Sequence, residues 1–138
     1  MRIRKNSTML ALFALGAAVL ACSGIPTKPT VTNTRMTTDA TGTTVTSTYA
    51  PGDAFFVFAD VSGLSAGSPM EAQWFAVNAQ GMAPGSLIST SKYVYEPGVA
   101  KVYFQLTTSD GSDWPSGSYR VQLFLNGEKV GEQGFTVQ

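Results

Sequence analysis

The sequence predicts an all-β domain, a sandwich or small barrel of about seven to eight antiparallel strands. Short runs of β-branched and aromatic residues recur at spacings of roughly 8–12 residues, with Gly, Pro, Asn or Asp between them. Gly is frequent, at 14 of 138 residues, and only 13% of the residues are charged, which favours turns and strands over helices with charged faces. No stretch after residue 22 has the 3.6-residue apolar period and the caps of a helix.

Taken in order, each predicted strand rests on a local pattern. A turn-forming segment, residues 39–42, separates two Thr-rich runs and predicts a hairpin between them. Residues 55–58 break the alternation of apolar and polar side chains, so we expect that strand to be covered on both faces. Asn126-Gly127 is the strongest short hairpin signal in the chain. The last strand changes phase between Val130 and Phe135, where Gly131 and Gly134 would suit a β-bulge. The predicted strands are residues 31–38, 43–49, 54–62, 70–79, 87–96, 99–108, 118–125 and 128–138.

The N-terminus reads as a secretory signal. Residues 1–8 carry three basic side chains and no acid, and residues 9–21 contain no polar side chain. That apolar run is shorter than the ~20 residues needed to span a membrane. It ends in Val19-Leu20-Ala21-Cys22, which resembles the lipobox of bacterial lipoproteins. The resemblance implies cleavage behind Ala21, acylation of Cys22 (palmitate among the chains), and a lipid anchor in the cell envelope.

Two further expectations follow from the lipobox resemblance. Ser23, where an Asp would commonly retain a lipoprotein in the inner membrane, favours the outer membrane. Cleavage leaves six basic and nine acidic side chains, because the removed residues hold three basic and no acidic ones. A mildly acidic chain lacks the excess of positive charge that binding to nucleic acid requires. The alternative is an ordinary signal peptide with a stray Cys beside its cleavage site.

The predicted organisation has three parts. Residues 1–21 form the signal peptide, residues 22–38 a lipidated Cys with a Thr/Pro-rich tether, and residues 39–138 the β-domain. Pro26 and Pro29 stiffen the tether. Its second half, from about Val31, could instead be the first strand.

Composition argues against most kinds of active site. The chain has no His, the residue most used for acid–base chemistry near neutral pH and for binding metals. Its single Cys cannot form an internal disulfide or a Cys-rich zinc site. Asp110 and Asp113 could offer carboxylates to Ca²⁺, but Asp and Gly in a loop are more often turn formers. We therefore expect no enzyme activity, no cofactor and no metal.

The parity of the strands predicts a binding surface. Side chains alternate between the two faces of a strand, so Trp74 and Leu123 point inward when Phe75, Val77 and Phe124 point outward. An exposed aromatic and aliphatic cluster on a small domain often marks a partner site. Either Phe75, Val77 and Phe124 bind a partner, or a further strand or the Thr-rich segment covers them.

Residues 114–137 carry a second resemblance, to bacterial immunoglobulin-like domains. They contain Pro and Gly before a Tyr, alternating apolar residues, an Asn-Gly turn and a final Phe-Thr-Val. The resemblance implies an immunoglobulin-like sandwich with Trp74 in the core, and with the hydroxyl of Tyr119 bonded to a preceding corner.

Together these patterns predict a non-catalytic envelope lipoprotein. Its β-sandwich is expected to bind another envelope protein within a surface or periplasmic complex. Because aromatic residues on a flat sheet can also stack on sugars, carbohydrate or cell-wall binding remains the alternative.

Overall fold

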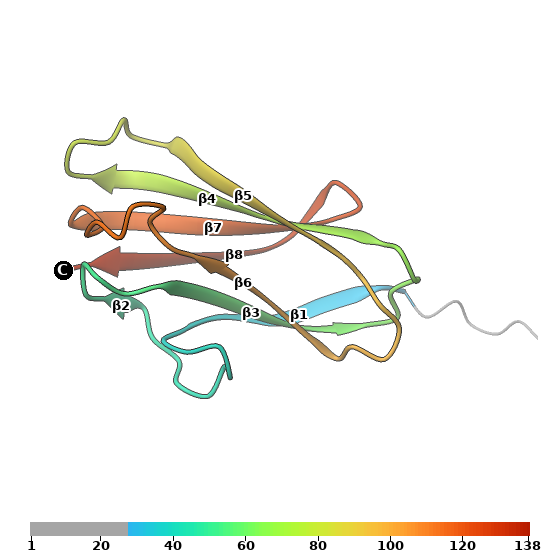
Figure 1. Ribbon diagram of the computed structural model, residues 1–138. Coiled ribbons are helices and arrows are strands. Elements are labelled where there is room, and N and C mark those ends of the chain that lie inside the picture. Colours follow the sequence, from blue (N-terminus) through green and yellow to red (C-terminus); the bar gives the residue numbers. More distant parts are fainter. Residues whose placement is uncertain (1–27) are drawn as a thin grey trace, which may run out of the picture.

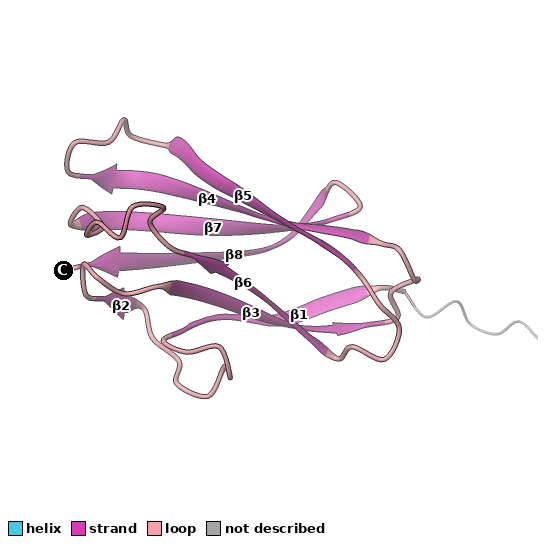
Figure 2. Ribbon diagram, in the orientation of Figure 1, coloured by secondary structure: helices cyan, strands magenta, loops and turns pink. Residues whose placement is uncertain are grey.

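The computed structural model describes residues 28–138, which form two β-sheets packed face to face (Figure 1). Within this range every regular element is a strand (Figure 2), which confirms the all-β prediction. The predicted signal peptide, residues 1–21, and Cys22 lie outside the described residues. None of the described residues belongs to a helix long and apolar enough to cross a membrane. The strands are β1 (Thr30–Thr37), β2 (Thr48–Tyr49), β3 (Phe55–Ser62), β4 (Pro69–Ala79), β5 (Ser86–Val94), β6 (Lys101–Leu106), β7 (Gly117–Leu125) and β8 (Glu128–Val137).

The two sheets differ in size. One has three strands in the order β1-β3-β6, and the other has five in the order β2-β8-β7-β4-β5. All pairs are antiparallel except β2 with β8, which is parallel. β1 lies against β8, and β5 lies against β6.

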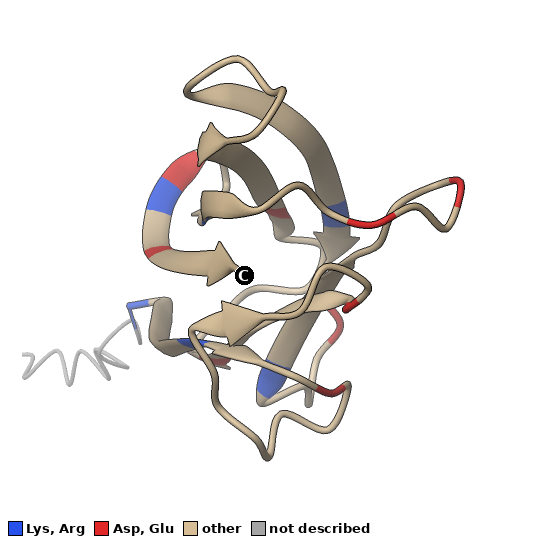
Figure 3. Ribbon diagram, turned by 90° about the vertical axis from the view of Figure 1, so that its left-hand side faces the viewer, with Lys and Arg blue, Asp and Glu red and all other residues tan. Residues whose placement is uncertain are grey.

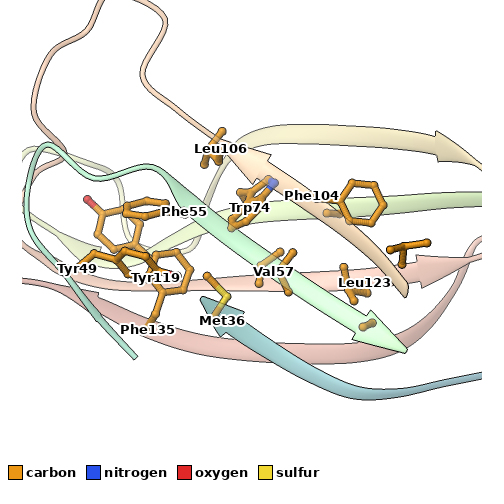
Figure 4. Packing of buried hydrophobic residues seen from close by; sticks show 14 of the residues in the cluster. Met36, Tyr49, Phe55, Val57, Trp74, Phe104, Leu106, Tyr119, Leu123 and Phe135 are labelled. Atoms are coloured by element: carbon orange, nitrogen blue, oxygen red, sulfur yellow. The ribbon is translucent and has the colours of Figure 1, made fainter. Parts of the chain in front are cut away.

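The core lies between the sheets, where the alternating patterns place it. On β4, Met70, Ala72, Trp74 and Ala76 are all buried, and Trp74 is completely inaccessible to solvent. This confirms Trp74 as a core residue. An aromatic cluster around Phe55 fills one end of the core (Figure 4). The ring centroid of Phe55 lies 4.8 Å from that of Trp114. The other members of this cluster are Tyr49, Tyr119 and Phe135.

The C-terminal hairpin follows its local sequence. Asn126 and Gly127 have φ angles of 51° and 80°, as the two central residues of a tight hairpin turn require. The hydroxyl of Tyr119 donates a hydrogen bond to the carbonyl of Pro115, which confirms the expected corner. The bulge in β8 leaves Val130 unpaired beside Gly131. Gly134 instead pairs regularly with Arg120.

The N-terminal part differs from two expectations. The prediction of a hairpin between residues 31–38 and 43–49 is wrong, apart from one isolated bridge from Thr37 to Val45. β1 pairs instead with β3, and β2 crosses to β8. The boundary at residue 39 is also too late. β1 occupies Thr30–Thr37, so the second half of the Thr-rich segment is the first strand of the sandwich.

The physical reason lies in β3, where Phe56 and Phe58 point away from the core yet are 8% and 4% exposed. The loop between β1 and β2 and the side chains of Arg35 and Tyr103 cover the ring of Phe58, and Tyr103 also lies beside Phe56, so both faces of β3 are covered as expected. Gly42 in that loop lies so close to Phe58 that a Cβ there would be 2.8 Å from the ring. Beyond the loop, Tyr49 enters the core and donates a hydrogen bond of 2.6 Å to the carbonyl of Thr37. Burial of apolar surface on both faces of β3 therefore stabilises the fold more than a longer local hairpin would.

Candidate functional site

The outer face of the five-stranded sheet carries the residues that the sequence predicts for binding. Phe75 and Phe124 are half-buried there, and Val77 is 37% exposed. Their neighbours along the strands, Trp74 and Leu123, are buried in the core. All three predicted residues therefore lie on one outward face, as the alternation indicated.

The register separates Phe124 from the other two. Phe75 stands opposite Arg120, and Phe124 stands opposite Glu71. The pair Gln73–Gln122 lies between these two pairs. A spacing of four residues along a strand is about 13 Å. The face thus has its apolar centre toward one end, at Phe75 and Val77, and Phe124 lies toward the other end.

Two further residues belong to this centre and were missed by the sequence analysis. Leu87 on β5 pairs with Phe75 and is 55% exposed. The guanidinium of Arg120 lies 4.9 Å from the centre of the Phe75 ring, within the range of a cation–π contact. We call Phe75, Val77, Leu87 and Arg120 the Phe75 patch. Only the strand register brings them together, so no local sequence signal could have identified the set.

A hollow of about 510 Å³ adjoins the Phe75 patch. Gly134 pairs with Arg120 and has no side chain, which leaves a gap in the outer face of β8. The Nε of Arg120 is buried and has no hydrogen-bond partner in the part of the chain that the structure describes. The residues around the hollow are Ser47, Val77, Ser118, Tyr119, Arg120, Glu132, Gly134, Phe135 and Thr136.

The electrostatics of the hollow are mixed. Hydrogen bonds from Lys129 and Gln122 lower the pKa of Glu132, and the nearby charge of Arg120 contributes to the same shift. The ammonium of Lys129 lies 2.9 Å from the Glu132 carboxylate, so this carboxylate already has partners of its own. Arg120 therefore faces the hollow as a cation that is not paired with Glu132, and this arrangement suits recognition of a polar or acidic group beside apolar ones.

The described residues show no arrangement suited to metal chemistry. Within residues 28–138 no three side chains of His, Cys, Asp or Glu gather closely enough to hold a metal ion. The carboxylate of Asp110 accepts a hydrogen bond from the amide of Ser112 at 3.0 Å, as an Asp in a turn does. Lys and Arg residues are scattered along the strands (Figure 3).

The three-stranded sheet presents one exposed aromatic residue. Tyr103 on β6 is 49% exposed, and its ring stacks on that of Phe58 at a centroid distance of 5.1 Å. Because Phe58 is itself covered, Tyr103 offers a single aromatic surface and no platform of several rings.

Comparisons with known proteins agree with this architecture. No protein-family model matches the chain, and no curated protein matches it. Among solved structures, an immunoglobulin-like protein from Pseudomonas aeruginosa is similar, with a TM-score of 0.61 and 14% identity. The similarity covers 83% of this chain and all of that one.

Two enzymes contain a domain of similar shape. An alkylpurine DNA glycosylase from Pseudomonas fluorescens has a TM-score of 0.51 and 12% identity, over 80% of this chain and 30% of that one. A β-glucosidase from Listeria innocua has a TM-score of 0.50 and 17% identity, over 80% of this chain and 16% of that one. At such identities the likeness concerns the fold alone. The chain thus carries an immunoglobulin-like β-sandwich domain.

Proposed function

We propose that this protein is a non-catalytic lipoprotein of the bacterial cell envelope, whose sandwich binds another envelope protein through the Phe75 patch. The lipobox-like segment ending at Cys22 supports the anchor, with the outer membrane as its site. The observation that carries the binding function is the outer face of the five-stranded sheet. It keeps Val77 and Leu87 in solvent beside a guanidinium that has an unpartnered nitrogen.

The chemistry of the Phe75 patch favours a protein over a sugar. Sugars bind flat against free aromatic rings, but the guanidinium of Arg120 lies over the ring of Phe75. Arg and aromatic residues surrounded by aliphatic ones are instead typical of the energetic centre of protein interfaces. Phe124, near the other end of the same face, would lie toward the rim of such an interface. Carbohydrate binding remains the second candidate, and it depends on Tyr103, the one half-exposed aromatic residue of the opposite sheet.

Site-specific photo-crosslinking in the native envelope tests this proposal. A photoreactive residue at position 77 or 87 should give adducts of discrete mass with a protein. Position 45 is the matched control, because Val45 is an aliphatic residue with 64% exposure in the loop over the other sheet. Phe75→Ser should reduce the adducts at position 87 strongly, since buried interface aromatics contribute about 2 kcal/mol or more. Phe124→Ser should reduce them less.

Three outcomes would contradict the proposal. Adducts at position 45 as abundant as those at positions 77 and 87 would mean nonspecific contact. The absence of protein adducts at both test positions would remove the Phe75 patch as an interface. Adducts that glycosidase digestion removes, or binding to purified glycans that Tyr103→Ala abolishes, would favour the carbohydrate alternative.

A further inference from the structure

The three-stranded sheet ends in an open edge at β6. The amide of Val61 donates a hydrogen bond of 2.9 Å to the carbonyl of Ala100, immediately before β6 begins. In an antiparallel pair, successive residues direct their backbone groups alternately toward and away from the partner strand. Val102, Phe104 and Leu106 therefore bond to β3, and the amides and carbonyls of Lys101, Tyr103 and Gln105 point away from it. Within residues 28–138 no other strand pairs with this edge.

The space beside this edge is incompletely filled. Four strands, β8, β7, β4 and β5, face only three, and β5 lies against β6 at the open side. The inward side chains of β5, including Ser89, Ser91 and Tyr93, are consequently only half-buried. A hollow of about 390 Å³ between Tyr93, Val99 and the start of β6 lies at one end of the edge. A second hollow, of about 330 Å³, lies between Ile88, Leu106 and the following loop at the other end.

We propose that β6 accepts one extended peptide segment of a partner as an additional antiparallel strand. Backbone hydrogen bonds to Lys101, Tyr103 and Gln105 would provide affinity, and the two hollows would receive alternate side chains of the segment. This surface is distinct from the Phe75 patch and goes beyond the function proposed above.

Charge decides what kind of segment fits. Lys101, at the start of β6, stands opposite Asp60 on β3, but the Asp60 carboxylate is bonded to Asn33 and Arg35, and Lys101 makes no ion pair within the part of the chain that the structure describes. Asp110 lines the hollow at the far end of the strand. The complementary antiparallel segment therefore has a basic residue near its N-terminal end, close to Asp110, and an acidic residue opposite Lys101. Small apolar side chains suit the positions that face β5.

A second copy of this chain fits the edge less well than a single strand. β5 stands beside β6 on the open side, and a two-fold pairing of β6 with its copy would bring two β5 strands into the same space. Lys101 on the edge also disfavours pairing with a like strand in any register that opposes the two lysines. The occupant is thus an extended segment that has no sheet of its own.

A synthetic peptide, Lys-Val-Thr-Val-Thr-Val-Asp with a polyethylene glycol tail, tests this inference on the full chain purified in detergent. In the antiparallel register its Asp lies opposite Lys101, and its two threonines lie opposite Tyr103 and Gln105. N-methylation of both threonines removes amides that would bond to β6 and should weaken binding at least about tenfold. N-methylation of the two valines that precede them is the matched control, because those amides point away from β6, and it should leave binding unchanged. Replacing the peptide Asp by Lys should weaken binding several-fold, and Lys101→Glu should reverse that preference.

Hydrogen exchange locates the bound peptide. The amides of Lys101, Tyr103 and Gln105 should exchange rapidly in the free chain and become protected by the peptide. Gln105→Pro removes one of these amides without breaking the pairing with β3, and it should abolish binding when its melting curve shows that it folds. Gln105→Val keeps the amide and should bind normally, and so should Phe75→Ser, which separates this site from the Phe75 patch. Four outcomes would overturn the inference. The peptide could protect Thr90 or Lys92 on β5 instead, or protection could depend only on protein concentration. The two N-methylated peptides could have equal effects, or the peptide could fail to bind at all.

Discussion

Gly42→Ala tests whether the loop between β1 and β2 keeps Phe58, on the outer face of β3, buried from solvent. Gly42 has a φ of +73°, which costs an alanine roughly 1–2 kcal/mol. The added Cβ would also lie 2.8 Å from a ring carbon of Phe58, closer than any van der Waals contact permits. If the loop moves enough to uncover about 50 Å² of that ring, the loss is about 1.3 kcal/mol at ~25 cal/mol per Å². The variant should therefore lose roughly 2–3 kcal/mol of its free energy of unfolding.

Gly85→Ala is the matched control for this substitution. Gly85 has nearly the same φ, +72°, and a Cβ added there would have no atom of another segment within 4 Å. Urea denaturation of both variants measures the backbone cost in Gly85→Ala and the backbone cost plus the ring contact in Gly42→Ala. Fluorescence quenching or hydrogen exchange around Phe58 should increase only in Gly42→Ala. Equal losses in the two variants would refute the conclusion that the loop packs on Phe58.

Three further predictions follow. Trp74→Ala should lower the free energy of unfolding measured in urea by about 3–5 kcal/mol, because it opens a cavity in the core. Phe75→Ala on the outer face should lower it by about 1 kcal/mol or less. Similar losses in the two variants would mean that β4 faces the other way. Burial raises the pKa of Tyr49 from 10.0 to about 12, so the folded state keeps this proton longer than the unfolded state, and the corresponding stability is present below pH 10 and lost as the pH rises toward 12. Thermal melts of Tyr49→Phe should accordingly show a smaller decline over that pH range than the wild type, and an identical decline would exclude Tyr49 as its source. Cys22→Ser should move the protein out of the detergent-extracted membrane fraction or block its processing, and an intact mass of the wild-type protein without acyl groups would contradict the anchor.

Much of the sandwich could be predicted from the sequence because its signals are local. The period of two along β4 and β7 separates Trp74 and Leu123 from Phe75 and Phe124, and any sheet that buries one face must respect it. Asn126-Gly127 determines the last hairpin through its own backbone preferences. Residues 55–58 could likewise be predicted to need cover on both sides, since four consecutive large apolar residues leave no polar face.

Contacts between distant segments decided the rest. The Thr-rich residues 30–37 pair with β3 along most of their length, and with the run that follows them only around the bridge from Thr37 to Val45, because pairing with β3 completes a sheet over the core. The composition of the candidate site depends on register, which sets Arg120 against Phe75, Leu87 beside it and Gln73–Gln122 between Phe75 and Phe124. The open edge of β6 has the same origin. A strand pattern predicts that a segment will pair, but the number of strands in each sheet depends on how the whole chain shares its apolar surface, and only the tertiary structure shows which edge is left without a partner.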